Sequence, residues 1–108
     1  MDLAEGVAVD DVRLCAFCTA HGIRSLRLFG SAVHGTLEPD SDIDLLVEFE
    51  LGRTPGLLTI AQLELDLGDV VGREVDLRTI RDLSRHFREQ VIAEARSVYG
   101  ATWRSRPR

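Results

Sequence analysis

The stretch GSAVHGTLEPDSDIDLLVEF, residues 30–49, decides the fold of this chain. Apolar and polar side chains alternate over residues 42–49, which predicts a β-strand because successive strand residues point to opposite faces. Four apolar residues share one face of this strand: Ile43, Leu45, Val47 and Phe49. Such a face indicates an interior strand, and its polar face is then expected to line a cleft.

The polar face of this strand carries two aspartates, Asp42 and Asp44. A spacing of two residues puts their backbones roughly 7 Å apart on one face, so the two carboxylates can converge on one cation. Carboxylate oxygens suit Mg²⁺, which keeps several waters and is usually completed by substrate phosphates. An isolated pair of this kind is most often a solvated strand face, but the interior position of the strand and the residues before it favour a metal site.

A glycine and a serine precede this strand. Gly30 and Ser31 end a predicted strand over residues 23–29 and open one helical turn over residues 32–35. A glycine lets the backbone approach a ligand closely, and the N–H groups at a helix start, together with a serine hydroxyl, bind phosphate. Gly-Ser alone is a common turn, but a phosphate-binding turn followed by a dicarboxylate strand is a much rarer combination.

A third acid lies in another alternating segment, residues 74–78. Asp76 stands between Val75 and Leu77, which are expected in the core, and therefore faces the opposite way. On a neighbouring strand it would complete a two-metal site, in which cations roughly 3.5–4 Å apart bind the attacking and leaving oxygens. By itself, Asp76 would be an ordinary exposed strand residue.

The remaining periodic segments predict helices. Apolar spacings of three and four residues predict helices over about residues 10–21 and 57–71, and a last helix from Phe87 to about Tyr99. The residues expected to face inward are Val9, Val12, Cys15, Ala16 and Thr19 in the first helix and Leu58, Ala61, Leu65, Gly68 and Val71 in the second. The order α-β-α-β-α-β-α predicts an α/β (α+β) fold, a mixed sheet of three or four strands flanked by helices. We expect one domain over residues 1–100 and a flexible basic tail over residues 101–108.

Composition and charge limit the classes of function that this chain can have. The 108 residues carry a net charge of −5, with 15 acids and 5 arginines up to residue 77 and 3 acids and 8 arginines after it. The acidic front part suits bound cations and argues against a broad nucleic-acid surface. No apolar run approaches the roughly 20 residues of a membrane span, and the start is acidic where a signal peptide is basic, so we expect a cytoplasmic protein without a membrane partner. Cys15 and Cys18 have the spacing of zinc and redox motifs, but they fall inside a predicted helix and are expected in the core.

These motifs together resemble those of the minimal nucleotidyltransferases of the DNA polymerase β superfamily. The likeness lies in GSAVHG at residues 30–35, SDIDLLV at residues 41–47 and GREVDL at residues 72–77, and it extends over about residues 17–99. It implies a small nucleotidyltransferase fold that binds Mg²⁺ and a nucleoside triphosphate and transfers a nucleotidyl group to a hydroxyl. Many members of the family are antitoxins encoded beside an all-helical HEPN ribonuclease toxin, which they neutralise by binding it or by adding AMP to one of its tyrosines.

The resemblance also implies roles for particular residues. Gly30 and Ser31 would hold the triphosphate. Asp42 and Asp44 would ligate both metal ions, and Asp76 would ligate the catalytic ion and help to deprotonate the attacking hydroxyl. Each of these positions matches the motif of the family.

One position departs from that motif: His34 stands where the family often has arginine. A neutral imidazole would stabilise the phosphates less than a guanidinium, which bears on turnover more than on metal binding. Three functions therefore stay open. The first is an Mg²⁺-dependent transferase that moves AMP from ATP to a hydroxyl, expected to be a tyrosine, of a HEPN toxin with which it forms a hetero-oligomer. The others are an antitoxin that acts by binding alone with a weak or vestigial site, and a small-molecule enzyme such as an aminoglycoside nucleotidyltransferase.

Overall fold

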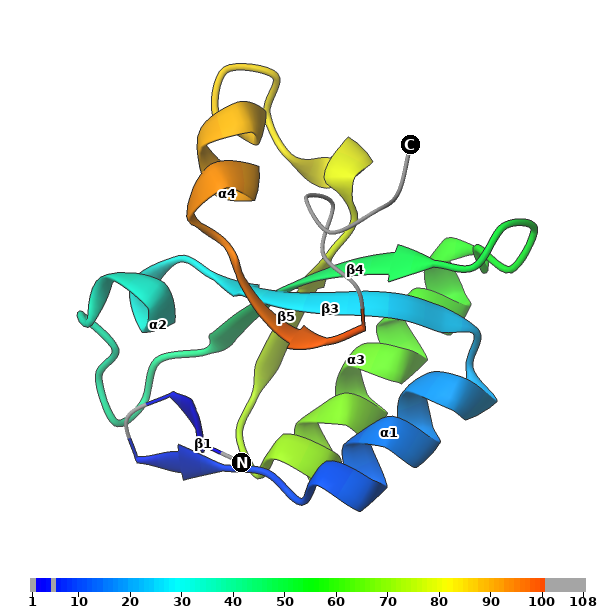
Figure 1. Cartoon of the computed structure of the whole chain (residues 1–108), viewed down its shortest axis with the longest axis horizontal. Helices are drawn as coiled ribbons and strands as arrows, with labels where there is room; N and C mark the ends of the chain where they lie inside the picture. Colours follow the sequence, from blue (N-terminus) through cyan, green and yellow to red (C-terminus); the bar gives the residue numbers. More distant parts are fainter. Residues whose placement is uncertain (1, 5, 101–108) are drawn as a thin grey trace.

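A four-stranded mixed sheet forms the centre of the computed structural model, which describes residues 2–4 and 6–100 (Figure 1). The strands follow the spatial order β5-β4-β3-β6. Their bounds are Ile23–Phe29 for β3, Ile43–Phe49 for β4, Val75–Arg78 for β5 and Arg96–Tyr99 for β6. β4 and β5 run parallel, whereas β3 is antiparallel to both β4 and β6. The predicted fold, a mixed sheet of three or four strands flanked by helices, is confirmed.

Two long helices cover one side of this sheet. In Figure 1, α1 and α3 lie side by side below β3 and β4, whereas α4 and the 3₁₀ helix η1 lie on the other side. The helices are α1 (Asp11–Ala20), α2 (Ser31–His34), α3 (Leu57–Val71), η1 (Ile80–Asp82) and α4 (Arg88–Glu94), and a small hairpin of β1 (Asp2–Ala4) and β2 (Val7–Ala8) precedes them. None of the helices formed by the described residues has the length and apolar character needed to span a membrane. The predicted tail, residues 101–108, lies outside the described residues.

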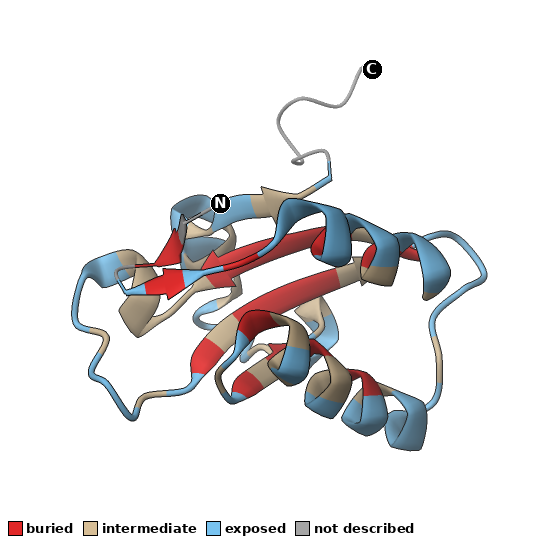
Figure 2. Ribbon diagram, turned by 90° about the horizontal axis from the view of Figure 1, so that it is seen from below, coloured by how far each residue is buried: buried red, intermediate tan, exposed pale blue. Residues whose placement is uncertain are grey.

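The core lies between the sheet and the two long helices. Cross-strand partners on the covered face pair Leu28 with Leu45 and Leu26 with Val47, and each of these four side chains is at most 2% exposed. Burying one such side chain stabilises the fold by roughly 1.5–3 kcal/mol. Figure 2 shows the buried residues running along the central strands and along one side of each long helix. The opposite, polar face of the sheet is thereby left for the functional site.

The predicted last helix is wrong in its second half. α4 ends at Glu94, and the next residues form β6, which pairs antiparallel with β3. Without β6, the outer edge of β3 would leave a row of backbone groups unpaired, and pairing satisfies them. Val98 and Tyr99, a β-branched and an aromatic residue, suit a strand and pack against the core. Tertiary pairing has therefore overridden a helical spacing of apolar residues. The hairpin of β1 and β2 was likewise not predicted.

The predicted inward faces of the two long helices are also wrong in part. The buried residues are Leu14 and Cys18 in α1 and Leu63, Leu67 and Val71 in α3. By contrast, Val12 is 77% exposed, Leu58 is 88% exposed and Leu65 is 67% exposed. Because α3 carries leucines on several sides, its sequence offers two apolar stripes, and the sheet selects the one that includes Leu67 and Val71.

The two cysteines differ in their surroundings. Cys18 is fully buried in the core as predicted, whereas Cys15 is exposed, and both are free thiols. Burial, with a smaller contribution from Cys15, raises the pKa of the Cys18 thiol to about 12. Since the thiolate is the form that attacks or binds metal, Cys18 is a packing residue at neutral pH.

Candidate functional site

Three aspartates gather at one end of the polar face. Asp44 in β4 and Asp76 in β5 are direct partners in the parallel register, so their side chains leave the sheet on the same face. Neighbouring strands are about 4.8 Å apart, which brings the two carboxylates close together. Asp42 is exposed and lies one residue before β4. The structure thus places all three predicted carboxylates on adjoining segments of the chain.

The charges of these aspartates act on one another. The pKa of Asp44 is raised above its ordinary value, chiefly because the carboxyl is half-buried and then because Asp76 and Asp42 repel its charge. Arg78 opposes this shift. A half-buried carboxylate facing two others is a place where a cation is strongly favoured.

A glycine lies directly against this cluster. Gly30, between β3 and α2, has a φ of +73°, in the region that residues with a side chain rarely adopt. A Cβ atom at Gly30 would collide with Oδ2 of Asp44. The Gly30 carbonyl accepts hydrogen bonds from the backbone N–H groups of Val33 and His34, which fixes the turn at the start of α2. Glycine is therefore required here for two separate reasons, and the backbone of this turn reaches the carboxylates closely. Ser31 follows as the first residue of α2.

His34 joins α2 to α4. It is the last residue of α2, and its Nε2 lies 2.8 Å from Oε1 of Glu94 at the end of α4. The hydrogen bond from His34, followed by one from Gln90, lowers the pKa of the Glu94 carboxyl. Both side chains of the pair stay substantially exposed. The structure thus gives His34 a contact between two helices that the sequence did not predict.

An arginine that sequence reasoning missed holds the loop before β4. The Arg73 guanidinium donates hydrogen bonds to the carbonyls of Glu38 and Ser41, which lie on the loop that leads into Asp42. Ser41 closes the same turn, because its hydroxyl accepts a hydrogen bond from the Glu38 N–H. Contacts to backbone carbonyls leave no trace in a sequence pattern, so nothing in the sequence marked Arg73.

A second missed arginine holds one of the carboxylates. The Nε of Arg78 lies 2.9 Å from Oδ1 of Asp76, and a terminal nitrogen of the same guanidinium lies 3.2 Å from Oδ2. This pairing raises the pKa of Arg78. The sequence could have indicated this contact, because Asp76 and Arg78 are two positions apart in one strand and therefore share a face.

A cavity opens beside the cluster. Its volume is about 760 Å³, and it lies between α3 and β5. Five acidic residues line it: Asp42, Glu64, Asp69, Glu74 and Asp76. Glu64 also accepts a hydrogen bond from the Leu77 N–H, 2.7 Å long, on the open edge of β5. Two of the three site aspartates therefore face an acidic space large enough for part of a substrate.

The donor set of the cluster fits a hard divalent cation. Asp42, Asp44 and Asp76 offer carboxylate oxygens, the ligands that Mg²⁺ prefers, and Arg78 pairs with one of them, Asp76. Within residues 2–4 and 6–100, however, no three side chains of the metal-binding types already stand in the arrangement of a metal site. The Arg78 guanidinium contacts both oxygens of Asp76, so it would compete with a metal ion for this carboxylate.

Comparisons with known proteins agree with this geometry. The sequence matches the nucleotidyltransferase domain over residues 14–99. The protein adenylyltransferase MntA of Thermococcus cleftensis is 38% identical over 68% of this chain and 72% of its own length. A solved structure provisionally described as a minimal nucleotidyltransferase is 44% identical, with a TM-score of 0.63 over 78% of this chain and 84% of that one. This chain belongs to the nucleotidyltransferase domain family and is thus an enzyme of the nucleotidyltransferase class. Its likeness to the minimal nucleotidyltransferases, first seen in residues 30–47 and 72–77, is confirmed.

A further solved structure shares the fold at lower identity. A toxin–antitoxin complex with AMP-PNP contains a chain that is 23% identical, with a TM-score of 0.68 over 86% of this chain and 75% of that one. At that identity the likeness concerns the fold alone.

Proposed function

We propose that this protein transfers AMP from ATP to a tyrosine hydroxyl of a HEPN-type toxin in an Mg²⁺-dependent reaction, and so acts as its antitoxin in the cytoplasm. The observation that carries the proposal is the pairing of Asp44 with Asp76 on parallel strands, with the Gly30 turn against Asp44. Support also comes from the similarity to a protein adenylyltransferase, and the fold is shared with a chain of a toxin–antitoxin complex that holds AMP-PNP.

Gly30 and Ser31 hold the triphosphate in this proposal. The left-handed turn at Gly30 exposes backbone N–H groups at the start of α2, and the Ser31 hydroxyl adds a donor beside them. His34, at the other end of the same four-residue helix, is positioned by Glu94 and sets how α2 faces the nucleotide. The phosphates then lie next to Asp44, where cations are favoured.

Asp42 and Asp44 would hold both Mg²⁺ ions, and Asp76 would hold the catalytic one. The ions, when bound, neutralise the phosphates and make the acceptor hydroxyl more acidic. The hydroxyl oxygen forms a bond to the α-phosphorus while the bond from that phosphorus to the bridging oxygen breaks, and pyrophosphate leaves with that oxygen. Asp76 helps to take the hydroxyl proton. The products are the AMP ester of the acceptor, pyrophosphate and the proton taken from the hydroxyl.

The acceptor is a protein in this proposal. A domain of 108 residues has little room to enclose a small acceptor as well as a nucleotide. The acidic cavity beside Asp42 and Asp76 suits an approaching segment with positive charge near its hydroxyl. A small-molecule acceptor would be modified without any partner present.

A second candidate function is neutralisation of the toxin by binding alone. One observation favours it: Arg78 occupies both oxygens of Asp76, so the carboxylates are not assembled for metal as they stand. In that case an Asp44→Ala variant that still binds the toxin would still protect against it. Loss of protection despite retained binding favours the transferase.

The test is the intact mass of the protein encoded beside this one, the proposed HEPN-type partner, after incubation with this protein, ATP and Mg²⁺. Transfer predicts a gain of whole AMP units that disappears without metal and in the Asp42→Ala/Asp44→Ala variant. A stable complex without any mass gain supports the binding-only antitoxin and contradicts the transferase.

A further inference from the structure

Arg78 contacts the two Asp76 oxygens that would bind the catalytic metal ion. Its guanidinium contacts Oδ1 and Oδ2 of Asp76 at 2.9 and 3.2 Å, which is the two-pronged geometry typical of arginine with a carboxylate. Each of these hydrogen bonds uses one of the two lone pairs of an Asp76 oxygen, and the guanidinium brings a positive charge close to the carboxylate. Arg78 therefore competes with a metal ion for Asp76, because it reduces the free lone pairs and because the two positive charges repel each other.

The position of Arg78 allows its side chain to move away from Asp76. Its side chain is 48% exposed and that of Asp76 is 32% exposed, so the pair borders on solvent. Arg78 is the last residue of β5, and the chain turns into η1 directly after it. A long, half-exposed side chain at the end of a strand can move into water without disturbing the core.

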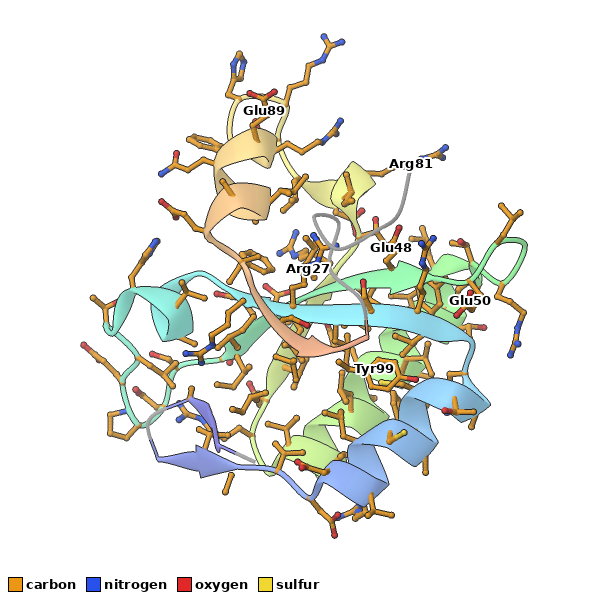
Figure 3. All side chains as sticks on the ribbon, viewed as in Figure 1. Arg27, Glu48, Glu50, Arg81, Glu89 and Tyr99 are labelled. Atoms are coloured by element: carbon orange, nitrogen blue, oxygen red, sulfur yellow. The ribbon has the colours of Figure 1, made fainter. Side chains whose placement is uncertain are left out.

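The other arginine on this face is placed differently. Arg27 in β3 is 4% exposed and pairs in register with Leu46, whose partner on the other side is Arg78. Figure 3 shows Arg27 on the side of the sheet that bears α4. Arg27 is thus buried two strands away from Asp76, whereas Arg78 contacts Asp76 directly at the border with solvent, so Arg78 is the better placed of the two to exchange with a metal ion.

We propose that Arg78 is a positioning residue that stands in for the catalytic metal: it holds the Asp76 carboxylate in the metal-free protein and is displaced when a divalent ion enters. This inference rests on the proposed function, because it takes the three aspartates to be the metal site. Arg78 offsets the repulsion among the aspartates before metal binds, and its competition raises the metal concentration at which the site fills. Removing the guanidinium frees Asp76 and tightens metal binding.

The test measures metal binding directly, without nucleotide or partner. Free Mn²⁺ is followed by its electron paramagnetic resonance signal during titration of the wild type, Arg78→Gln and Arg78→Lys at physiological salt. Arg81→Gln is the matched control, because Arg81 is an exposed residue of η1 that points outward in Figure 3 and its loss changes the net charge equally. Circular dichroism checks that each variant is folded.

Arg78→Gln is expected to bind Mn²⁺ about 2- to 5-fold more tightly than the wild type, the fold-change that corresponds to one half-exposed ion pair. The Mn²⁺ affinity of Arg78→Lys is expected to lie between those of the wild type and Arg78→Gln, since lysine keeps the charge but cannot make the two-pronged contact. Arg81→Gln should change the affinity by less than Arg78→Gln, because exposed charges beyond about 8 Å are screened.

An Arg78→Gln affinity equal to or weaker than that of Arg81→Gln overturns the inference. Asp44→Asn separates this outcome from failure of the proposed function. If Asp44→Asn no longer binds Mn²⁺ while Arg78→Gln binds it with wild-type affinity, the metal site is supported and the proposed role of Arg78 is contradicted. If Asp44→Asn binds Mn²⁺ unchanged, or no variant binds it, the metal site itself is contradicted and the inference falls with it.

Discussion

Replacing Asp44 with asparagine is expected to make the protein more stable and inactive. Asp44 lies directly beside Asp76 on the neighbouring parallel strand, is half-buried, and has a pKa raised by burial and by two like charges. Like charges directly opposite each other in a sheet destabilise it by roughly 0.2–1 kcal/mol. Asparagine has nearly the same shape, so it removes the charge without touching the Gly30 turn. Since 1 kcal/mol shifts the Tm of a domain of this size by about 4–8 °C, the Tm should rise by about 1–8 °C.

The effect has a defined pH dependence. A carboxyl whose pKa is raised on folding destabilises the folded state fully above its folded pKa, and this penalty vanishes as the pH falls to the ordinary value near 3.8. The Tm difference between Asp44→Asn and the wild type should therefore be largest at neutral pH and shrink as the pH falls through the folded pKa of Asp44.

Thermal unfolding followed by circular dichroism between pH 4 and pH 8 measures this difference. Added Mg²⁺ should raise the Tm of the wild type and leave that of Asp44→Asn almost unchanged, because bound ligand stabilises only the state that binds it. Asp42→Asn is the matched control, and its exposed position predicts a smaller gain. A lower Tm for Asp44→Asn at neutral pH, or a difference that does not change with pH, would contradict charge repulsion at Asp44.

Four further variants test the Gly30 turn, the packing of α3 and the contact between His34 and Glu94. Gly30→Ala forces a side chain into a left-handed turn against a carboxylate, so we expect a loss of about 1–3 kcal/mol in urea unfolding and loss of nucleotide binding; a neutral effect contradicts the tight turn. Leu67→Ala should cost about 2–5 kcal/mol because Leu67 is fully buried, whereas Leu58→Ala at 88% exposure should stay within about 0.5 kcal/mol; equal effects would mean that α3 packs by another face. Glu94→Gln should speed hydrogen exchange in α4 at neutral pH, because it weakens the contact of residue 94 with His34. The difference from the wild type should disappear as the pH falls through the lowered pKa of Glu94, where the wild type loses the same contact. Unchanged hydrogen exchange would contradict a stabilising role of that contact.

The strands that carry the site were predictable from the sequence. The predicted strands over residues 23–29, 42–49 and 74–78 agree with β3, β4 and β5 to within one residue at each end. Strict alternation fixes which side chains share a face, so the common face of Asp44 and Asp76 followed once the two strands became neighbours. The local sequence pattern was sufficient for β4 and β5, because both segments are short and alternate apolar with polar residues.

The parts that failed depend on contacts between distant segments. β6 exists because β3 has a free edge to pair with, and residues 96–99 contain nothing that excludes a helix. The burial of Leu67 instead of Leu65 is decided by how α3 lies on the sheet. The same holds for the site: the contact between His34 and Glu94 spans 60 residues, and no spacing rule connects them.

Nucleotidyl transfer is tested most directly with ATP labelled at either the α- or the γ-phosphate, incubated with this protein, the proposed HEPN-type partner and Mg²⁺. Nucleotidyl transfer predicts that the acceptor retains the α label, that the γ label leaves as pyrophosphate, and that Asp76→Asn abolishes both events. Label from the γ-phosphate on the acceptor, or α label that persists in Asp76→Asn, would contradict nucleotidyl transfer by these carboxylates.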